Sequence, residues 1–119
     1  MSKIINKPWG KEEVLEINNR FMVEKLTMFS GHRCSIQYHQ IKLETVYVLS
    51  GALKIYYGKN LNNLEQKIYY AGDYITVHPG LIHRMEAVED STYIECSTPE
   101  MDDVVRLSDD YNRVNDVDS

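Results

Sequence analysis

The sequence is poor in the features that mark secreted, membrane-spanning and nucleic-acid-binding chains. Its 119 residues include only two cysteines, and 13 basic residues stand against 18 acidic ones. No apolar run approaches the roughly 20 residues of a membrane-spanning helix, and the N-terminal residues lack the apolar stretch of a signal peptide. A formal net charge of −5 provides no general attraction for phosphate backbones or anionic membranes. We therefore expect a cytoplasmic protein with no nucleic-acid or membrane partner.

Cysteine is too scarce to build a structural framework of disulfides. Cys34 and Cys96 each lie in an apolar, strand-like run, and a domain of this size can bury a sufficient core without a disulfide. We predict that both are reduced core residues. The length fits a single domain over residues 1–119, of which residues 113–119 are expected to form a flexible acidic tail.

What the chain does contain is a succession of short stretches rich in Val, Ile, Tyr and Thr, separated by turn-forming residues. Such stretches are typical of β-strands. They lie at residues 13–17, 21–29, 34–38, 45–49, 53–57, 66–70, 74–77, 83–87 and 92–96. About nine strands at near-regular spacing indicate an all-β sandwich, jelly roll or small barrel. Helical periodicity occurs only after Pro99, so a short helical segment is expected at residues 101–113.

Two segments bring together side chains that can bind a metal ion. Gln37 and His39 are two residues apart in a predicted strand, so their side chains leave the same face. The residues between His39 and Glu44 have the length of a hairpin connection, which brings Glu44 beside them on the next strand. His83 follows a Pro-Gly turn at the start of a returning strand. Since inward positions of a closed barrel can face a common centre, we predict a site for one divalent metal ion.

The predicted ligands do not single out one metal. Two imidazoles, a carboxylate and an amide oxygen suit several divalent ions, and no thiolate is present to choose among them. Zn²⁺ is the first expectation, and Mn²⁺, Fe²⁺, Co²⁺ or Ni²⁺ fit the same donors. The alternative is that these are unrelated polar residues of separate strands. Against it, a buried glutamate and two buried histidines without partners would destabilise the fold.

These two segments resemble the two motifs of the cupin superfamily. Gln37 replaces the first histidine of the usual His-x-His, which is the form found in phosphomannose isomerases. The likeness is closest to the isomerase domain of the bifunctional phosphomannose isomerase/mannose-1-phosphate guanylyltransferase family (type II phosphomannose isomerase). It runs through KPWG at 7–10, SIQYH at 35–39, HRME at 83–86, IE at 94–95, DDVVRL at 102–107 and YNR at 111–113. No glycine-rich nucleotidyltransferase motif occurs in this sequence, so only the isomerase half is expected in it.

The resemblance implies a double-sheet β-barrel and an aldose–ketose isomerase acting on a phosphorylated hexose, of the mannose 6-phosphate/fructose 6-phosphate type. Glu95, which matches a glutamate of the family, or His78, which lies near His83, would move the proton between C1 and C2. Arg106 would hold the substrate phosphate with its planar guanidinium. The same resemblance implies metal ligation by Gln37, His39, Glu44 and His83.

Two other functions stay open. A non-catalytic cupin that binds a sugar or another metabolite is favoured by departures from the family pattern, since Thr45-Val46 stands where His-Trp is usual and Ala87 where asparagine is common. An Fe-dependent cupin dioxygenase is less favoured, because Gln37 replaces a histidine that those sites commonly use. Small cupins often pair edge to edge, so we expect a homodimer that covers an exposed strand edge.

Overall fold

The computed structural model describes residues 3–113, and in this range the secondary structure consists of strands alone. The strands are β1 (Lys3–Lys7), β2 (Gly10–Ile17), β3 (Met22–Met28), β4 (Ile36–Tyr38), β5 (Glu44–Ser50), β6 (Ala52–Gly58), β7 (Glu65–Tyr70), β8 (Tyr74–Val77), β9 (Ile82–Ala87), β10 (Ser91–Ser97) and β11 (Val105–Ser108). Nothing in the described range forms a helix of the length and apolar character needed to cross a membrane.

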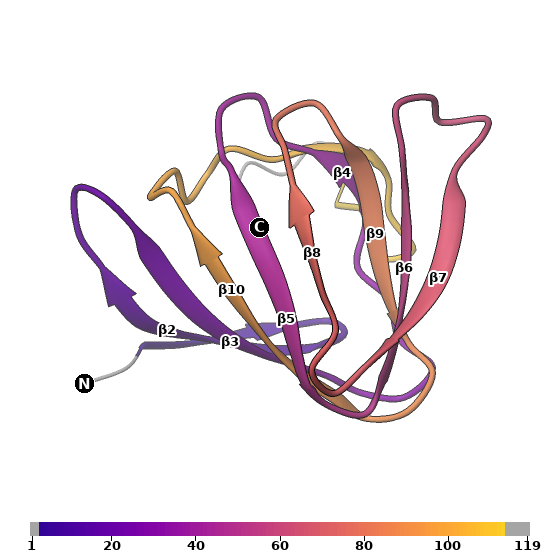
Figure 1. Cartoon of the computed structure of the whole chain (residues 1–119), viewed down its shortest axis with the longest axis horizontal. Helices are drawn as coiled ribbons and strands as arrows, with labels where there is room; N and C mark the ends of the chain where they lie inside the picture. Colours follow the sequence, from indigo (N-terminus) through magenta and orange to yellow (C-terminus); the bar gives the residue numbers. More distant parts are fainter. Residues whose placement is uncertain (1–2, 114–119) are drawn as a thin grey trace.

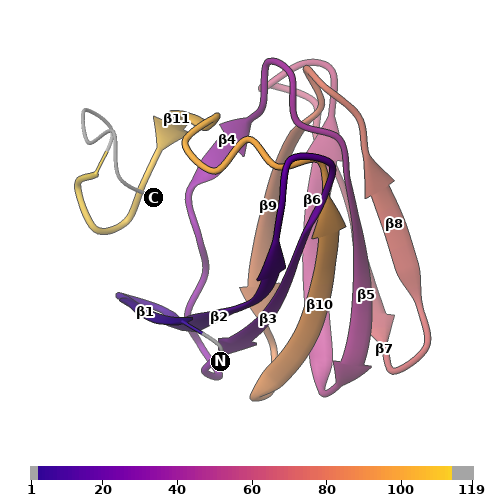
Figure 2. The ribbon, with the colours of Figure 1, turned by 90° about the vertical axis from the view of Figure 1, so that its left-hand side faces the viewer.

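The strands form two antiparallel sheets that face each other (Figure 1). The order of the first sheet is β1-β2-β3-β10-β5-β8, and that of the second is β11-β4-β9-β6-β7. β4 is short, and its register with β9 places Gln37 opposite His83. β11 pairs with the other side of β4 at the edge of the second sheet (Figure 2). The predicted all-β, double-sheet fold is confirmed.

Alternation along each strand decides which side chains fill the space between the sheets. On β3, Met22, Leu26 and Met28 are buried and share their face with Glu24. On β5 the buried positions are Glu44, Val46 and Val48. The same periodicity that builds the apolar core therefore also places carboxyl groups inside it.

The helix predicted at residues 101–113 is wrong. Val105–Ser108 forms β11, and turns lie on either side of it. The free edge of β4 offers unpaired backbone groups, and the β-branched Val105 suits a strand better than a helix. The segment after β11 forms a turn that is stabilised by Asp109. Its carboxylate accepts hydrogen bonds from the Arg113 backbone at 2.7 Å and from the Arg113 guanidinium at 2.9 Å. Of the predicted acidic tail at 113–119, all but Arg113 lies outside the described residues.

The two cysteines differ in environment. Cys34 lies in the core, 8% exposed, and its Sγ accepts a hydrogen bond from the Met85 backbone at 3.3 Å. Cys96 is exposed, so its prediction as a core residue is wrong. The reason is strand parity, because the inward positions around it on β10 belong to Glu95 and Ser97. Both thiols are free.

Candidate metal centre and its cavity

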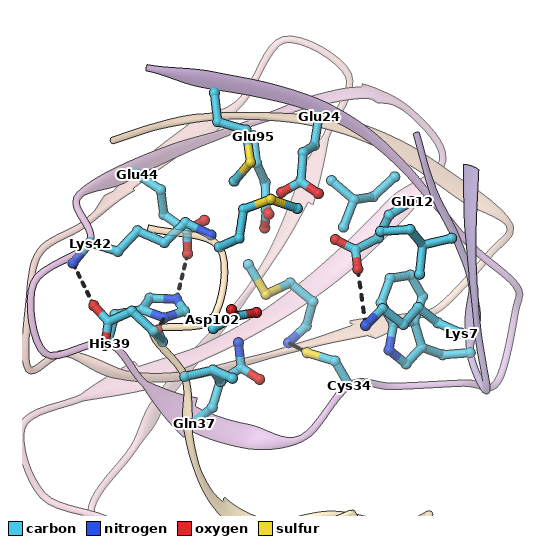
Figure 3. A pocket seen from close by; sticks show the side chains of 18 of the residues that line it. Lys7, Glu12, Glu24, Cys34, Gln37, His39, Lys42, Glu44, Glu95 and Asp102 are labelled. Atoms are coloured by element: carbon cyan, nitrogen blue, oxygen red, sulfur yellow. Dashed lines mark hydrogen bonds and ion pairs between the residues drawn. The ribbon is translucent and has the colours of Figure 1, made fainter. Parts of the chain in front are cut away.

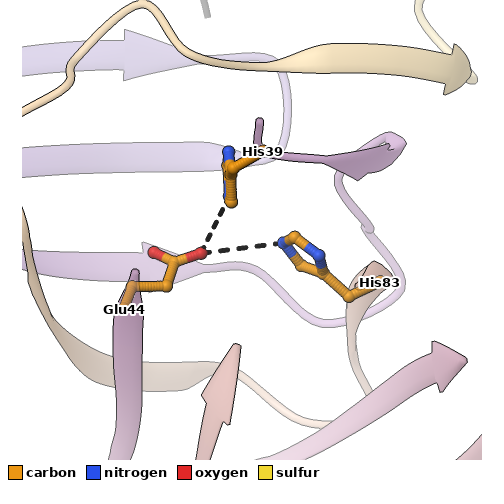
Figure 4. Close-up of side chains that lie close together, drawn as sticks. All are labelled: His39, Glu44 and His83. Atoms are coloured by element: carbon orange, nitrogen blue, oxygen red, sulfur yellow. Dashed lines mark hydrogen bonds and ion pairs between the residues drawn. The ribbon is translucent and has the colours of Figure 1, made fainter. Parts of the chain in front are cut away.

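Three of the predicted metal ligands meet between the two sheets. His39 follows β4, Glu44 begins β5 and His83 lies on β9. Their potential ligand atoms all lie within 4.8 Å of one another, and each residue is at most 4% exposed. His39 Nε2 is 2.9 Å from Glu44 Oε1, and His83 Nε2 is 3.7 Å from the same oxygen. Figure 4 shows both rings directed at this carboxylate.

Both imidazole rings are oriented by backbone carbonyls. His39 Nδ1 donates to the carbonyl of Asp103 at 2.5 Å, and His83 Nδ1 donates to the carbonyl of Leu81 at 2.9 Å. With its hydrogen on Nδ1, the His83 ring presents the lone pair of Nε2 to a metal. His39 Nε2 is hydrogen-bonded to Glu44 Oε1 and must release its hydrogen to ligate an ion. His83 Nε2 is buried and has no hydrogen-bond partner among the described residues, which is unfavourable unless a further ligand is bound. This arrangement fits a divalent cation held by His39, Glu44 and His83.

The protonation states at this site also suit a cation. Burial opposes ionisation of Glu44, but the hydrogen bond with His39 and the charges of His83, His39 and Lys42 lower its pKa to about 2. Burial lowers the pKa of His83, against the opposing effect of Glu44. An ionised carboxylate and a neutral imidazole are the forms that bind metal ions.

Gln37, the fourth predicted ligand, lies beside these three residues. It is paired with His83 across β4 and β9, and it lines the adjoining cavity. Its Oε1 accepts a hydrogen bond from Ser35 Oγ at 2.6 Å. An amide oxygen has a second lone pair, so this bond is compatible with metal ligation, which stays a prediction for Gln37.

A cavity of about 430 Å³ opens beside the ligands, a volume typical of small-molecule sites. Trp9, Met22, Leu26 and Met85 contribute apolar parts of its wall. Figure 3 shows that charged side chains surround it. They are Lys3, Lys7, Glu12, Glu24, Lys42, Glu44, Glu95, Asp102, Asp103, Arg106 and Arg113. A wall so rich in charged groups suits a polar ligand.

Four neighbouring strands each contribute one carboxyl to this cavity, and we call Glu12, Glu24, Glu95 and Glu44 the carboxyl row. Glu24 on β3 stands directly opposite Glu95 on β10. Glu12 on β2 and Glu44 on β5 occupy the flanking strands. Lys7 ends the row, with its Nζ 3.2 Å from Glu12 Oε1. Glu44 and Glu95 were predicted from the sequence as site residues, and Glu12 and Glu24 were missed. Glu24 shares strand parity with Met22 and Leu26, which could have revealed that its side chain points inward.

Burial and mutual repulsion raise the pKa values in the middle of the row. Burial is the largest cause of the rise in the pKa of Glu24 to about 8, and the hydrogen bond and charge of Glu12 add to it, while Lys42 opposes. Burial also raises the pKa of Glu95 well above its ordinary value, with Glu44 and Glu24 adding. A carboxyl group with a pKa of about 8, like that of Glu24, can exchange protons near neutral pH.

The other predicted site residues lie at different distances from the cavity. Glu95 is half-buried and lines it. Arg106 on β11 also lines it, is 6% exposed, and donates from Nη1 to the carbonyl of Arg113 at 3.4 Å. His78 is exposed in the turn between β8 and β9 and is not among the described residues that line the cavity. The structure thus brings Glu95 and Arg106 to the cavity and leaves His78 outside it.

Two antiparallel sheets folded around a cavity, with a cluster of histidine and glutamate side chains between them, place this protein in the class with a cupin fold. An RmlC-like cupin from Shewanella frigidimarina has the same fold, with a TM-score of 0.72 and 20% identity over 83% of this chain and 85% of that one. The sequence narrows the class further. The chain belongs to the family described as mannose-6-phosphate isomerase C-terminal, whose profile matches residues 1–109.

Other relatives are more distant or much longer. The mannose-1-phosphate guanylyltransferase ManC of Salmonella typhimurium is 27% identical over 124 residues, which cover 96% of this chain and 24% of that protein. The chain thus spans about a quarter of the length of this curated relative. Oxalate decarboxylase of Bacillus subtilis, a protein with Mn(II) centres, shares the fold with a TM-score of 0.75 and 19% identity, over 88% of this chain and 30% of that one. These likenesses show family and fold, and they assign no metal or reaction to this chain.

Proposed function

We propose that this domain is a metal-dependent aldose–ketose isomerase acting on a phosphorylated hexose, such as the mannose 6-phosphate and fructose 6-phosphate pair. The observation that carries the proposal is the convergence of two imidazole nitrogens and an ionised carboxylate beside a charged cavity. The family to which the chain belongs supports a sugar phosphate as the substrate. A divalent ion bound by His39, Glu44 and His83, with Gln37 as a fourth ligand, would supply Lewis acidity toward the carbonyl and hydroxyl oxygens of the open-chain sugar.

Glu95 is the proposed base. Isomerisation requires a proton to leave C2 of the aldose and to arrive at C1, and a positioned carboxylate can carry it. Glu95 lines the cavity, and its raised pKa makes its carboxylate a stronger base than that of an exposed glutamate. Glu24 stands opposite it across β3 and β10 and adds to the rise of its pKa. His78 is the weaker candidate because it is exposed outside the cavity wall.

Arg106 is the proposed phosphate ligand. Its guanidinium offers several donors in a plane, which suits the oxygens of a phosphate. It lies on β11 opposite Gln37 of β4, and therefore next to the strand that leads to the metal centre. Arg113, held by Asp109 at 2.9 Å, lines the same cavity and adds positive charge.

A sugar-phosphate isomerase assay on the full chain tests this function. Mannose 6-phosphate is supplied to protein stripped with a chelator and to the same protein reconstituted with Zn²⁺, Mn²⁺ or Co²⁺. We expect fructose 6-phosphate only from reconstituted protein, loss of turnover in Glu44→Ala and His83→Ala, and a raised KM in Arg106→Ala. Full activity in metal-stripped protein would overturn the proposal.

The same samples separate the two alternatives. Saturable binding of sugar phosphate without turnover would favour a non-catalytic cupin. Thr45 and Val46, where the family pattern differs, are not among the described residues that line the cavity. The hydroxyl of Thr45 is hydrogen-bonded to that of Thr76 at 2.9 Å, and Val46 is fully buried in the core. Oxygen uptake by the iron-loaded protein would favour a dioxygenase.

A further inference from the structure

We infer that Asp103 is a positioning residue for the metal centre, which it holds in place through the loop that joins two of the ligands. The inference rests on the proposed metal site. The loop consists of residues 40–43 and connects His39, after β4, to Glu44, at the start of β5. Asp103 belongs to the distant segment between β10 and β11.

The side chain of Asp103 binds three successive backbone amides of this loop. Its Oδ1 accepts a hydrogen bond from Gln40 at 3.0 Å. Its Oδ2 accepts hydrogen bonds from Ile41 at 2.7 Å and from Lys42 at 2.8 Å. Hydrogen bonds to an ionised acceptor are stronger than neutral ones. Both oxygens are engaged in this way, so Asp103 acts on the loop rather than as a further metal ligand.

The backbone of Asp103 acts on a ligand directly. Its carbonyl oxygen accepts the hydrogen bond from His39 Nδ1 that orients the ring. One residue therefore fixes both the imidazole and the chain that follows it. Thr98 completes the attachment, because its Oγ1 accepts from the Leu43 amide at 3.0 Å and its own amide donates to the Leu43 carbonyl at 3.0 Å.

The spacing between His39 and Glu44 thus depends on a segment that lies far away in the sequence. All four loop amides are bonded to the chain after β10. Metal ligands must be held close to their productive geometry, and partners that orient them affect metal affinity by about 10- to 100-fold. Losing the Asp103 carboxylate would free three amides, release the Asp103 carbonyl to move, and let the His39 ring turn.

The test compares metal affinity in Asp103→Ala with that in Asp102→Ala, using the full chain. Asp102 is the matched control, because it lies next in sequence, lines the same cavity and carries the same charge, while the bonds from residues 40–42 go to Asp103. Affinity for Co²⁺ is measured by competition with a chelator, and the absorption spectrum of bound Co²⁺ reports the geometry of its ligands. We expect Asp103→Ala to weaken Co²⁺ binding by about 10- to 100-fold and to change the spectrum, and Asp102→Ala to leave both close to wild type.

Amide hydrogen exchange in the metal-free proteins provides a second measurement of how firmly the loop is held. Exchange at residues 40–42 should be faster in Asp103→Ala than in wild type, with the rest of the sheets unchanged. Unaltered Co²⁺ affinity in Asp103→Ala, in a chain whose wild type binds Co²⁺, would overturn the inference and leave the proposed function standing. If the wild type binds no metal, the proposed function fails, and unaltered exchange at residues 40–42 would then refute the role of Asp103 as well. Should Asp103→Ala fail to fold, Asp103→Asn keeps the shape and loses the charge, and a smaller effect in the same direction is expected.

Discussion

At the scale of single residues, Glu95 carries the chemistry proposed for the cavity. Replacing it with glutamine removes the base and keeps the size of the side chain. We expect Glu95→Gln to lower kcat by about 10²- to 10⁴-fold, with metal content unchanged because Glu95 is not one of the three clustered ligands. Steady-state kinetics and elemental analysis on one preparation measure both quantities. Glu89→Gln, at an exposed position, is the control, and a Glu95→Gln variant with wild-type kcat would remove Glu95 from the mechanism.

Glu24 should make the stability of the fold depend on pH. Its pKa is about 8 in the folded protein against an ordinary 4.5, so between these values the folded state keeps a proton that the unfolded chain releases. The free energy of unfolding therefore falls as pH rises through this window, by up to about 1.4 kcal/mol per pH unit for one proton. Glu24→Gln removes this contribution, so urea unfolding at about pH 5.5 and about pH 7.5 should show a smaller loss in the variant than in wild type. Equal losses in the two proteins would contradict the assignment.

Some site residues follow from local sequence and others do not. The cluster of His39, Glu44 and His83 could be predicted, since strand parity, hairpin length and a Pro-Gly turn each act over a few residues. No local pattern indicated that Lys42 or Asp103 belongs to the site. Their place at the site depends on how the segment after β10 returns to the loop at residues 40–43, and that contact joins parts of the chain far apart in sequence.

At the scale of elements, the turn between β5 and β6 depends on Gly51. Its φ is +91°, and a Cβ at this position would overlap the carbonyl oxygen of Asp90. Gly72 has a similar φ of +92° but open space around it, so Gly72→Ala carries the backbone strain without the overlap. We expect Gly72→Ala to destabilise the fold by about 1–2 kcal/mol and Gly51→Ala to destabilise it by clearly more. Urea unfolding of both variants tests this, and equal destabilisation would mean that the contact with Asp90 is unimportant.

The nine strands predicted from the sequence are all present, and the two that were missed lie at the edges of sheets. β1 and β11 are the first strands in the order of their sheets. β1 exposes several of its residues, and β11 is surrounded by acidic residues, so neither shows a clear alternation of apolar and polar side chains. Their pairing partners decide their conformation, and those partners are not visible in a local pattern.

At the scale of the whole molecule, the candidate centre joins the two sheets. Glu44 belongs to β5 of the first sheet, while His83 belongs to β9 of the second and His39 follows β4 of the second. A bound ion would therefore hold the sheets together and stabilise only the folded state, by about 2.7 kcal/mol at a hundredfold excess over Kd. We expect chelator to lower the Tm of wild type and to leave that of Glu44→Ala unchanged. A wild-type Tm insensitive to both metal and chelator would contradict this linkage.

The homodimer stays a prediction, for which size-exclusion chromatography is the measurement.

The metal content of the purified chain, determined by elemental analysis beside Glu44→Ala and His83→Ala, decides whether the metal centre exists. We expect about one divalent ion per chain in wild type and its loss in both variants, each of which should remain folded by circular dichroism. Wild-type protein that was never exposed to chelator and still contains no divalent metal, or variants that retain it in full, would contradict the claim that His39, Glu44 and His83 form a metal centre.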